Sequence, residues 1–248
     1  MDNSLPCVLI TGAADRIGAV MTRTFHQLGY NVAIHYRSSQ NKAAALAQQL
    51  EQQRQDSTLL LQCELSDIGA LQQLPTKVYQ HFGRLDMIIN NASAFYPTPM
   101  ESASEEQWHA LMDANLKGPF FLAQAARQYL DDQCGSIINL VDIYAQRPLA
   151  EHPIYCIAKA GNEAMVKSLA LELGPHIRVN GISPGAIMWP AIEATPQEKQ
   201  RQAKIIEKTA LKRCGKAQDI AHTAVYLATN EYISGQIISI DGGRTLAC

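Results

Sequence analysis

The sequence lacks a strong charge of either sign, and this lack excludes several classes of protein. Its 21 basic and 23 acidic residues leave a formal net charge of -2, so we expect no nucleic-acid partner. Charged residues make up only 18% of the 248 residues and hydrophobic residues 47%. This balance argues against a disordered chain and indicates a globular protein with a full hydrophobic core.

Long apolar runs and paired cysteines are missing as well. No stretch approaches the length of a membrane span, and the N-terminus MDNSLPCVLITG has neither the basic segment nor the apolar run of a signal peptide. The six cysteines are scattered without a C-x-x-C pair, the usual spacing of a zinc site or a redox dithiol. We therefore expect reduced cysteines, no metal, no membrane partner and a cytoplasmic location.

Short apolar runs alternate with longer segments of helical periodicity along the whole chain. Strands are expected at 7–11, 31–35, 58–62, 85–90, 136–140, 178–182 and 236–240. Helices are expected at 16–28, 42–53, 68–82, 105–130 with a kink at Gly118-Pro119, 154–173, 197–208 and 217–227. This order predicts an α/β fold, a single-domain, doubly wound Rossmann-type parallel sheet with helices on both faces. Within residues 1–248, we expect 5–140 to bind a dinucleotide and 141–248 to carry catalytic and substrate residues.

The first expected strand runs into a turn of small residues, TGAADRIG, which opens the first helix. Small residues let the backbone approach a pyrophosphate, and the free N–H groups of the helix start bind it. Gly12 permits the tight turn, and Gly18 permits close packing of the helix on the strand. The turn therefore predicts a dinucleotide site that includes Gly12, Arg16, Ile17 and Gly18.

The end of the second expected strand has no carboxylate. A fold that binds NAD places an acid there to bind the ribose 2′-hydroxyl, whereas this segment reads IHYRSS. The planar guanidinium of Arg37 and the hydroxyl of Ser38 suit a 2′-phosphate instead. The segment favours NADPH, with His35 and Tyr36 as further contacts; the alternative for Arg37 is a solvated side chain at a strand end.

Tyr155 and Lys159 lie four residues apart on an expected helix and so share one face. A tyrosine with its ordinary pKa of about 10 is a poor acid near neutral pH. A lysine ammonium and an oxidised nicotinamide ring both favour the phenolate, so we expect the pKa of Tyr155 to be lowered. The same spacing occurs in ordinary amphipathic helices, so the pair alone does not identify an enzyme.

In their order along the whole chain, these motifs resemble the short-chain dehydrogenase/reductase family. Its other landmarks here are Asn90-Asn91-Ala92, Asn115, Ser183-Pro184-Gly185 and Asp241-Gly242-Gly243. The resemblance implies hydride transfer at Tyr155 and Lys159. It also implies self-association, expected as a homotetramer, with a structural role for the turn at 241–243.

The resemblance assigns roles to further residues. Asn115 would anchor a water that relays protons through Lys159, and Pro184 to Ile187 would pass beside the nicotinamide. Asn91 and Ala92 would line the adenine side of the cofactor. The remaining expected cofactor contacts are Glu64, Leu65, Ser93, Tyr155, Lys159, Pro184, Gly185 and Ile187.

Two positions depart from the general family pattern. Asp142 stands where the family carries a serine, and Arg16 replaces the middle glycine of the turn. Together with the segment NASAFYPTP at 91–99 and the strand end at Arg37, these departures resemble the pteridine reductase branch. Reduction of a pterin C=N bond needs a hydride at carbon and a proton at nitrogen, and a partly buried Asp142 beside Tyr155 can hold that proton.

The same resemblance suggests substrate contacts, each with a plainer alternative. Phe95 is expected to stack on the flat heterocycle, or else to pack in the core. Arg16 is expected to contact the pterin or a cofactor phosphate, and its alternative is to neutralise the pyrophosphate alone. Asp142 is alternatively a turn cap. The remaining candidates are Tyr155, Ser93, otherwise a loop cap, and Trp189, otherwise a lid residue without substrate contact. Ile187, an expected cofactor contact, is apolar where parasitic members of the branch have a polar residue.

The leading hypothesis is an NADPH-dependent reductase of dihydropterins, with dihydrobiopterin, dihydromonapterin and dihydrofolate as candidate substrates. The rival among enzymes is a carbonyl reductase of the 3-oxoacyl type, which prefers a serine at position 142. A rival of another class is a non-catalytic sensor that only binds NADPH. Such a sensor has no need of Tyr155, Lys159 and Asn115 together.

Overall fold

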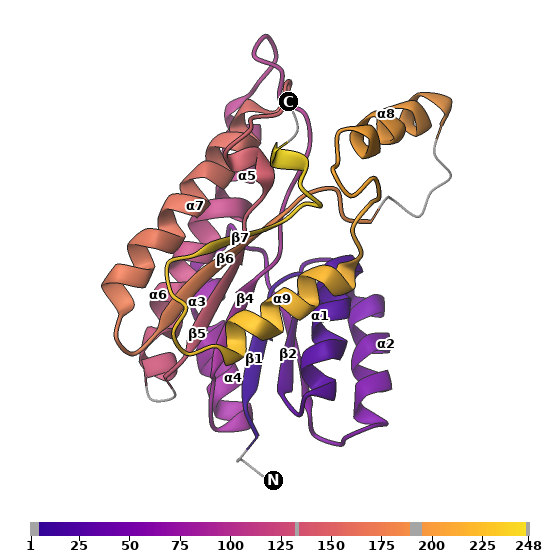
Figure 1. Ribbon diagram of the computed structural model, residues 1–248. Helices are drawn as coiled ribbons and strands as arrows, with labels where there is room; N and C mark the ends of the chain where they lie inside the picture. The colour runs from indigo at the N-terminus through magenta and orange to yellow at the C-terminus, as the bar shows by residue number, and fades with distance from the viewer. Residues whose placement is uncertain (1–4, 132–133, 189–194, 247–248) are drawn as a thin grey trace.

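Seven parallel strands form the centre of the structure, a computed structural model that describes residues 5–131, 134–188 and 195–246 (Figure 1). Their order across the sheet is β3-β2-β1-β4-β5-β6-β7. The strands are β1 (Cys7–Ile10), β2 (Asn31–Tyr36), β3 (Thr58–Gln62), β4 (Met87–Asn90), β5 (Ser136–Leu140), β6 (Arg178–Pro184) and β7 (Ile237–Ile240). All neighbouring pairs are parallel, so the predicted Rossmann-type sheet is confirmed.

Helices cover both faces of this sheet (Figure 1). They are α1 (Arg16–Gln27), α2 (Gln40–Glu51), α3 (Ile68–Gln72), α4 (Leu74–Phe82), α5 (Glu105–Met112), α6 (Gly118–Asp131), α7 (Pro153–Leu173), α8 (Pro196–Glu207) and α9 (Ala217–Thr229). Along β1, Val8 and Ile10 belong to a core with α1, α2 and α9, whereas Cys7 and Leu9 belong to a core with α3, α4, α6 and α7. The strands are apolar on both faces because both faces are covered.

One predicted helix is wrong in its extent. The segment 68–82 forms two helices, because α3 ends at Gln72 and α4 begins at Leu74. Pro75 lies in the first turn of α4, where its missing N–H leaves no bond unmade. Because Pro75 has no N–H to donate to the carbonyl of Leu71, four residues earlier, the helical hydrogen-bond pattern is interrupted and a new helix starts at Leu74.

The kink expected at Gly118-Pro119 takes the form of a wider, π-helical turn at Asp113–Lys117 between α5 and α6. Pro119 has no N–H to donate to the carbonyl of Asn115, four residues earlier. That carbonyl instead accepts a hydrogen bond of 2.7 Å from Nδ2 of Asn162 on α7. The proline thus frees a backbone acceptor that ties α7 to this turn.

Asn162 is one member of a chain of buried amides. Nδ2 of Asn90 on β4 donates to Oδ1 of Asn139 on β5 at 2.8 Å, and Nδ2 of Asn139 donates to Oδ1 of Asn162 at 3.1 Å. Asn90, Asn139 and Asn162 are all buried. These bonds fix α7 against the carboxyl ends of the two central strands.

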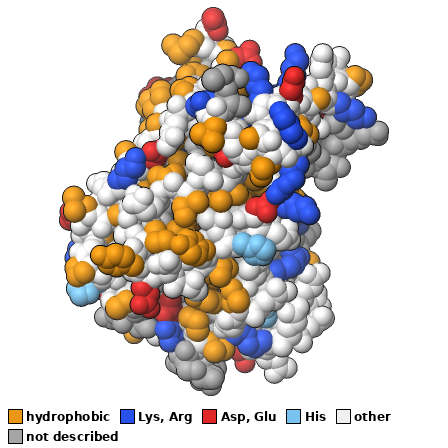
Figure 2. Space-filling model, viewed as in Figure 1, with side chains coloured by type: hydrophobic (Ala, Val, Ile, Leu, Met, Phe, Trp, Pro, Cys, Tyr) orange, Lys and Arg blue, Asp and Glu red, His pale blue; other side chains and the backbone are white. Residues whose placement is uncertain are grey.

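By contrast, α8 has no buried residue, and its ribbon stands away from the sheet (Figure 1). Figure 2, in the same view, shows basic side chains on this part of the surface. The start of α8 is set by local signals, since Thr195 and Glu198 form a capping box and Pro196 occupies the first turn. Its lysines and arginine, Lys199, Arg201 and Lys204, are exposed. Within the described ranges, no helix is both long enough and apolar enough to cross a membrane.

The amide chain predicts the effect of Asn139→Ala. The change leaves buried amide groups of Asn90 and Asn162 without partners, so the free energy of unfolding should fall by about 2 to 4 kcal/mol. Urea denaturation measures this loss. Asn41→Ala, at an exposed position on α2, is the control and should change stability by less than about 0.5 kcal/mol. Equal effects of the two substitutions would contradict the role of the amide chain.

Candidate active site

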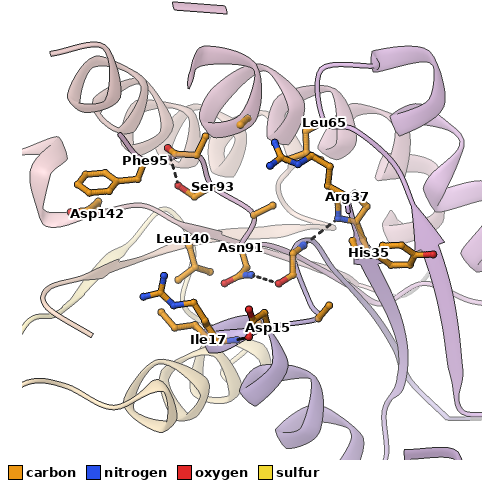
Figure 3. A pocket seen from close by; sticks show the side chains of 18 of the residues that line it. Asp15, Ile17, His35, Arg37, Leu65, Asn91, Ser93, Phe95, Leu140 and Asp142 are labelled. Carbon is orange, nitrogen blue, oxygen red and sulfur yellow. Dashed lines mark hydrogen bonds between the residues drawn. The ribbon is translucent and has the colours of Figure 1, made fainter. Parts of the chain in front are cut away.

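A cleft of about 510 Å³ opens at the carboxyl ends of the strands, where the strand order reverses between β1 and β4 (Figure 3). Ligands of open α/β sheets bind at such a point. Every residue expected to contact the cofactor lines this cleft. Lining residues that the sequence did not single out are Ala14, Asp15, Ser39, Ala94, Ala114, Leu140 and Val141.

The glycine turn forms the floor of one end of the cleft. Gly12 has φ +61°, and a Cβ atom on Gly18 would lie 2.1 Å from the carbonyl oxygen of Gly12. Nδ2 of Asn91 donates to the carbonyls of Thr11 at 2.8 Å and Gly12 at 3.1 Å, which holds the turn against the end of β4 (Figure 3). The bare backbone and the open start of α1 fit a dinucleotide pyrophosphate.

His35 supports the same turn from below. Its Nδ1 accepts a hydrogen bond of 3.2 Å from the N–H of Gly12, and its Nε2 lies 3.1 Å from the carbonyl oxygen of Cys63. This pattern requires the neutral tautomer with the proton on Nε2. Burial lowers the pKa of His35 to about 4, so the ring stays neutral at physiological pH.

Arg16 lies at the mouth of the cleft in an unusual conformation for a residue with a side chain, since its φ is +49°. Its Nη2 donates to the carbonyl oxygen of Met188, after β6, at 3.4 Å. The guanidinium therefore spans the cleft from the glycine turn to the segment after β6. This position suits a pterin contact and a phosphate contact alike. Trp189, the next residue after Met188, lies outside the described residues.

Two ion pairs flank the end of β2. Nε of Arg37 lies 3.7 Å from Oε2 of Glu64, and Nζ of Lys42 lies 2.5 Å from Oδ2 of Asp15. Lys42 lowers the pKa of the Asp15 carboxyl, which also caps the start of α1. The pairing of Lys42 with Asp15 was missed from the sequence, because the two residues are 27 positions apart and carry no shared motif.

Tyr155 and Asp142 meet in the cleft, where the Tyr155 hydroxyl donates to Oδ2 of Asp142 at 2.7 Å. Oδ1 of Asp142 accepts from the N–H of Tyr144 at 2.9 Å and caps the short helical turn Ile143–Ala145. Asp142 is thus both a turn cap and a partner of Tyr155. Burial raises the pKa of the Asp142 carboxyl above its ordinary value.

Lys159 lies beneath the tyrosine ring, with Nζ 5.7 Å from the ring centroid, and it donates to the carbonyl oxygen of Leu140 at 2.8 Å. Burial lowers the pKa of Lys159 to about 8. The pKa of Tyr155 is raised well above 10, first by burial and then by the Asp142 carboxylate. The chain's own residues therefore shift the pKa of Tyr155 in the direction opposite to the one expected from the sequence.

Asn115 lies in the π-helical turn and does not line the cleft. Its Nδ2 donates to the carbonyls of Ala94 and Leu111, both at 2.9 Å, and its Oδ1 accepts from the Ser93 hydroxyl at 2.6 Å. The side chain thereby holds the loop that carries Ser93 and Phe95. The water relay through Lys159 stays a prediction.

Phe95 lines the cleft and is 51% exposed, which argues against the alternative of core packing. Its ring meets Tyr155 edge-on at a centroid distance of 4.8 Å and stacks on His152 at 4.8 Å with an interplanar angle of 14°. His152, just before α7, was not singled out from the sequence. The rings of Phe95 and His152 form an aromatic wall beside Tyr155.

Comparisons with known proteins place the chain in a large family. A family model described as enoyl-(acyl carrier protein) reductase matches residues 12–245. Pteridine reductase 1 of Leishmania tarentolae is 31% identical, with 97% of this chain and 96% of that protein covered. The 3-oxoacyl-[acyl-carrier-protein] reductase FabG of Staphylococcus aureus is 33% identical, with 95% and 96% covered.

Among solved structures, that of a putative short-chain alcohol dehydrogenase from Sinorhizobium meliloti is similar to this chain. Its TM-score is 0.91 at 29% identity, with 98% of this chain and 97% of that chain covered. Relatives of different named activities thus match about equally well. The substrate must therefore be argued from the side chains of the site.

His35 gives a prediction for stability against pH. Between about pH 6.5 and 4 the unfolded chain binds a proton at His35 and the folded chain does not, so this residue's contribution to stability is lost as the pH falls through that window. His35→Leu removes this dependence and takes their His35 partner from the N–H of Gly12, which is partly buried, and from the carbonyl of Cys63, which is buried. Unfolding free energy should drop by about 2 to 4 kcal/mol at pH 7.5.

The difference in unfolding free energy between the parent protein and His35→Leu should then become smaller by up to about 3 kcal/mol as the pH falls towards 4. Urea titrations at pH 7.5, 6 and 5 test this trend. His81→Gln, at an exposed position at the end of α4, is the matched control and should keep the parent's pH dependence. A constant difference across the pH range would show that His35 is not held neutral by the fold.

Proposed function

Because the chain belongs to the short-chain dehydrogenase/reductase family, we propose that it is an NADPH-dependent pteridine reductase. Its reaction would reduce a dihydropterin to the tetrahydro form, with dihydrobiopterin, dihydromonapterin and dihydrofolate as candidates. The observation that carries this proposal is the 2.7 Å hydrogen bond between Tyr155 and the buried Asp142 carboxyl in the cleft. The acid stands where a proton donor is required.

Reduction of a C=N bond adds a hydride to carbon and a proton to nitrogen. NADPH, when bound, supplies the hydride and its electron pair. As the C=N bond pair moves onto nitrogen, Asp142 delivers the proton and becomes a carboxylate. The Tyr155 hydroxyl and the Tyr144 N–H then both donate to that carboxylate, and the buried ammonium of Lys159 offsets its charge.

Phe95 supports a flat heterocyclic substrate. Aromatic rings stack with centroids roughly 4.5 to 7 Å apart, and Phe95 lines the cleft with about half of the residue exposed. His152 fixes the ring from its other side, so little conformational entropy is lost when a pterin covers it. A rigid aromatic wall next to the proton donor aligns the ring nitrogen with Asp142.

The end of β2 supports NADPH over NADH. Arg37, Ser38 and Ser39 line this end of the cleft, and Lys42 is paired with Asp15, which also lines it. Ser39 precedes α2 without capping it, so the first N–H groups of that helix are available for a 2′-phosphate. The carboxylate of Glu64 is offset by its pairing with Arg37.

A 3-oxoacyl reductase is the second candidate, because FabG proteins are as similar to this chain as the pteridine reductase is. Ketone reduction needs a proton at the carbonyl oxygen, which the tyrosine of this family would donate. Burial, and after it the carboxylate form of Asp142, raise the pKa of Tyr155 and so make the tyrosine a weaker acid. The aspartate therefore favours the pterin reaction, where the carboxyl itself donates.

Side-by-side turnover tests the proposed function. We expect NADPH oxidation with dihydrobiopterin or dihydrofolate to exceed that with acetoacetyl-CoA by at least about tenfold in kcat/KM, and NADPH to be preferred over NADH. Absorbance at the nicotinamide band measures each rate. Acyl turnover without pterin turnover would favour the carbonyl reductase, and cofactor binding without any turnover would favour the sensor.

Asp142→Ser tests the proton donor directly. Pterin turnover should fall by about 10²- to 10⁴-fold, the usual contribution of a positioned acid. NADPH affinity, measured by fluorescence titration, should stay within about twofold because the serine keeps a hydroxyl for the turn cap. Asp142→Asn is the matched isosteric control for packing. Unchanged pterin turnover in either variant would show that Asp142 is not the proton source.

A further inference from the structure

A series of contacts links the C-terminal turn to the proposed proton donor. Nη2 of Arg244 donates to the Tyr144 hydroxyl at 3.1 Å, and its guanidinium carbon lies 5.5 Å from the centroid of the Tyr144 ring. The backbone N–H of Tyr144 in turn donates to Oδ1 of Asp142. Tyr144 therefore touches Arg244 through its side chain and Asp142 through its backbone.

The turn that presents Arg244 is firmly built. Oδ2 of Asp241, directly after β7, accepts from the N–H and the hydroxyl of Thr245 at 2.7 and 2.8 Å. Oδ1 of Asp241 accepts from the N–H of Gly243 at 2.9 Å. Gly242 and Gly243 have φ of +63° and +78°, which glycine adopts without strain. The central sheet thus fixes the place of the Arg244 backbone.

Charged and titratable groups reach Asp142 from two further elements. Tyr155, Cys156 and Lys159 come from α7, and Arg244 comes from the C-terminal turn. Burial favours the neutral carboxyl, whereas Lys159 and Arg244 both favour the carboxylate and lower its pKa. Neither Tyr144 nor Arg244 lines the cleft, so their effect on Asp142 does not require contact with substrate or cofactor.

We propose that Arg244 is a positioning residue for Asp142. Through Tyr144 it fixes the turn that presents the carboxyl, and its positive charge favours release of the proton to the substrate. The inference rests on the proposed function, because a proton leaves Asp142 only if a C=N bond is reduced there. It gives the Asp-Gly-Gly turn a part in the active site beyond the structural role expected from the sequence.

Three variants separate the charge from the hydrogen bond. Arg244→Met removes both, Arg244→Lys keeps the charge but loses the planar fork, and Tyr144→Phe keeps the ring and the arginine. The measurements are kcat against pH with the dihydropterin that turns over fastest, and the Kd for NADPH. Arg201→Met, on the exposed helix α8, is the control.

Arg244→Met should lower kcat by about tenfold and leave the Kd for NADPH within about twofold. The alkaline limb of the kcat–pH profile should move to higher pH by roughly half to one unit. The reason is that loss of a nearby cation raises the pKa of Asp142, so the carboxyl keeps its proton to a higher pH. Arg244→Lys should keep the parent's limb. Tyr144→Phe should lower kcat with little movement of the limb. Lys159 titrates in all variants alike, so differences between them report on Asp142.

The titration of Asp142 is also followed without turnover, by ¹³C NMR of labelled aspartate carboxyls assigned with Asp142→Asn. A raised midpoint in Arg244→Met, in a protein that turns over no dihydropterin, would refute the proposed function and support the action of Arg244 on Asp142. The inference would be overturned if Arg244→Met turns over pterin while neither the alkaline limb of its kcat–pH profile nor the titration midpoint of Asp142 moves. If Arg244→Met does not fold, Arg244→Lys becomes the test. An alkaline limb of its kcat–pH profile that moves by the half to one pH unit expected for Arg244→Met would overturn the inference as well.

Discussion

The arrangement of the site depends on the buried amide chain that begins at Asn90 and ends at the carbonyl of Asn115. Each asparagine joins a different element, so β4, β5, α7 and the π-helical turn are locked in one register. In a low-dielectric interior an unpaired amide lowers the stability of the fold. A hydrogen-bonded series of amides that is partly broken is therefore less stable than apolar side chains at the same positions. The register matters because α7 carries the tyrosine and lysine, and the turn holds the loop with the aromatic wall.

Electrostatics at the acid position is a balance rather than a single strong interaction. Burial pushes the Asp142 carboxyl towards its neutral form, and two cations with two hydrogen-bond donors push it back. The same burial makes Lys159 easier to deprotonate and Tyr155 harder to ionise. One desolvated cleft thus moves all three pKa values towards uncharged side chains, which is the state in which a carboxyl can donate a proton.

Much of the fold was predictable because buried parallel strands have a plain signature of short apolar runs, and all seven were found. The helix at 68–82 was predicted wrongly in its extent, since its apolar periodicity continues through the break at Gln73. The glycine turn and Arg37 were predicted from local motifs, and the other cleft residues by resemblance, with Asp142 and Arg16 as the informative departures. The amide chain was missed because a lone asparagine in a strand has no local meaning until its partner is known. Arg244 was missed for a similar reason, since Tyr144 lies 100 residues away.

The backbone conformation of Arg16 lowers the stability of the fold at the mouth of the cleft. A residue with a Cβ atom at φ +49° is strained by about 1 to 3 kcal/mol relative to a relaxed backbone, and a glycine there would be free of that strain. The fold is therefore less stable than its own glycine variant would be at this turn. A glycine at this position would relieve the backbone but would remove the guanidinium that reaches the carbonyl of Met188 across the mouth of the cleft.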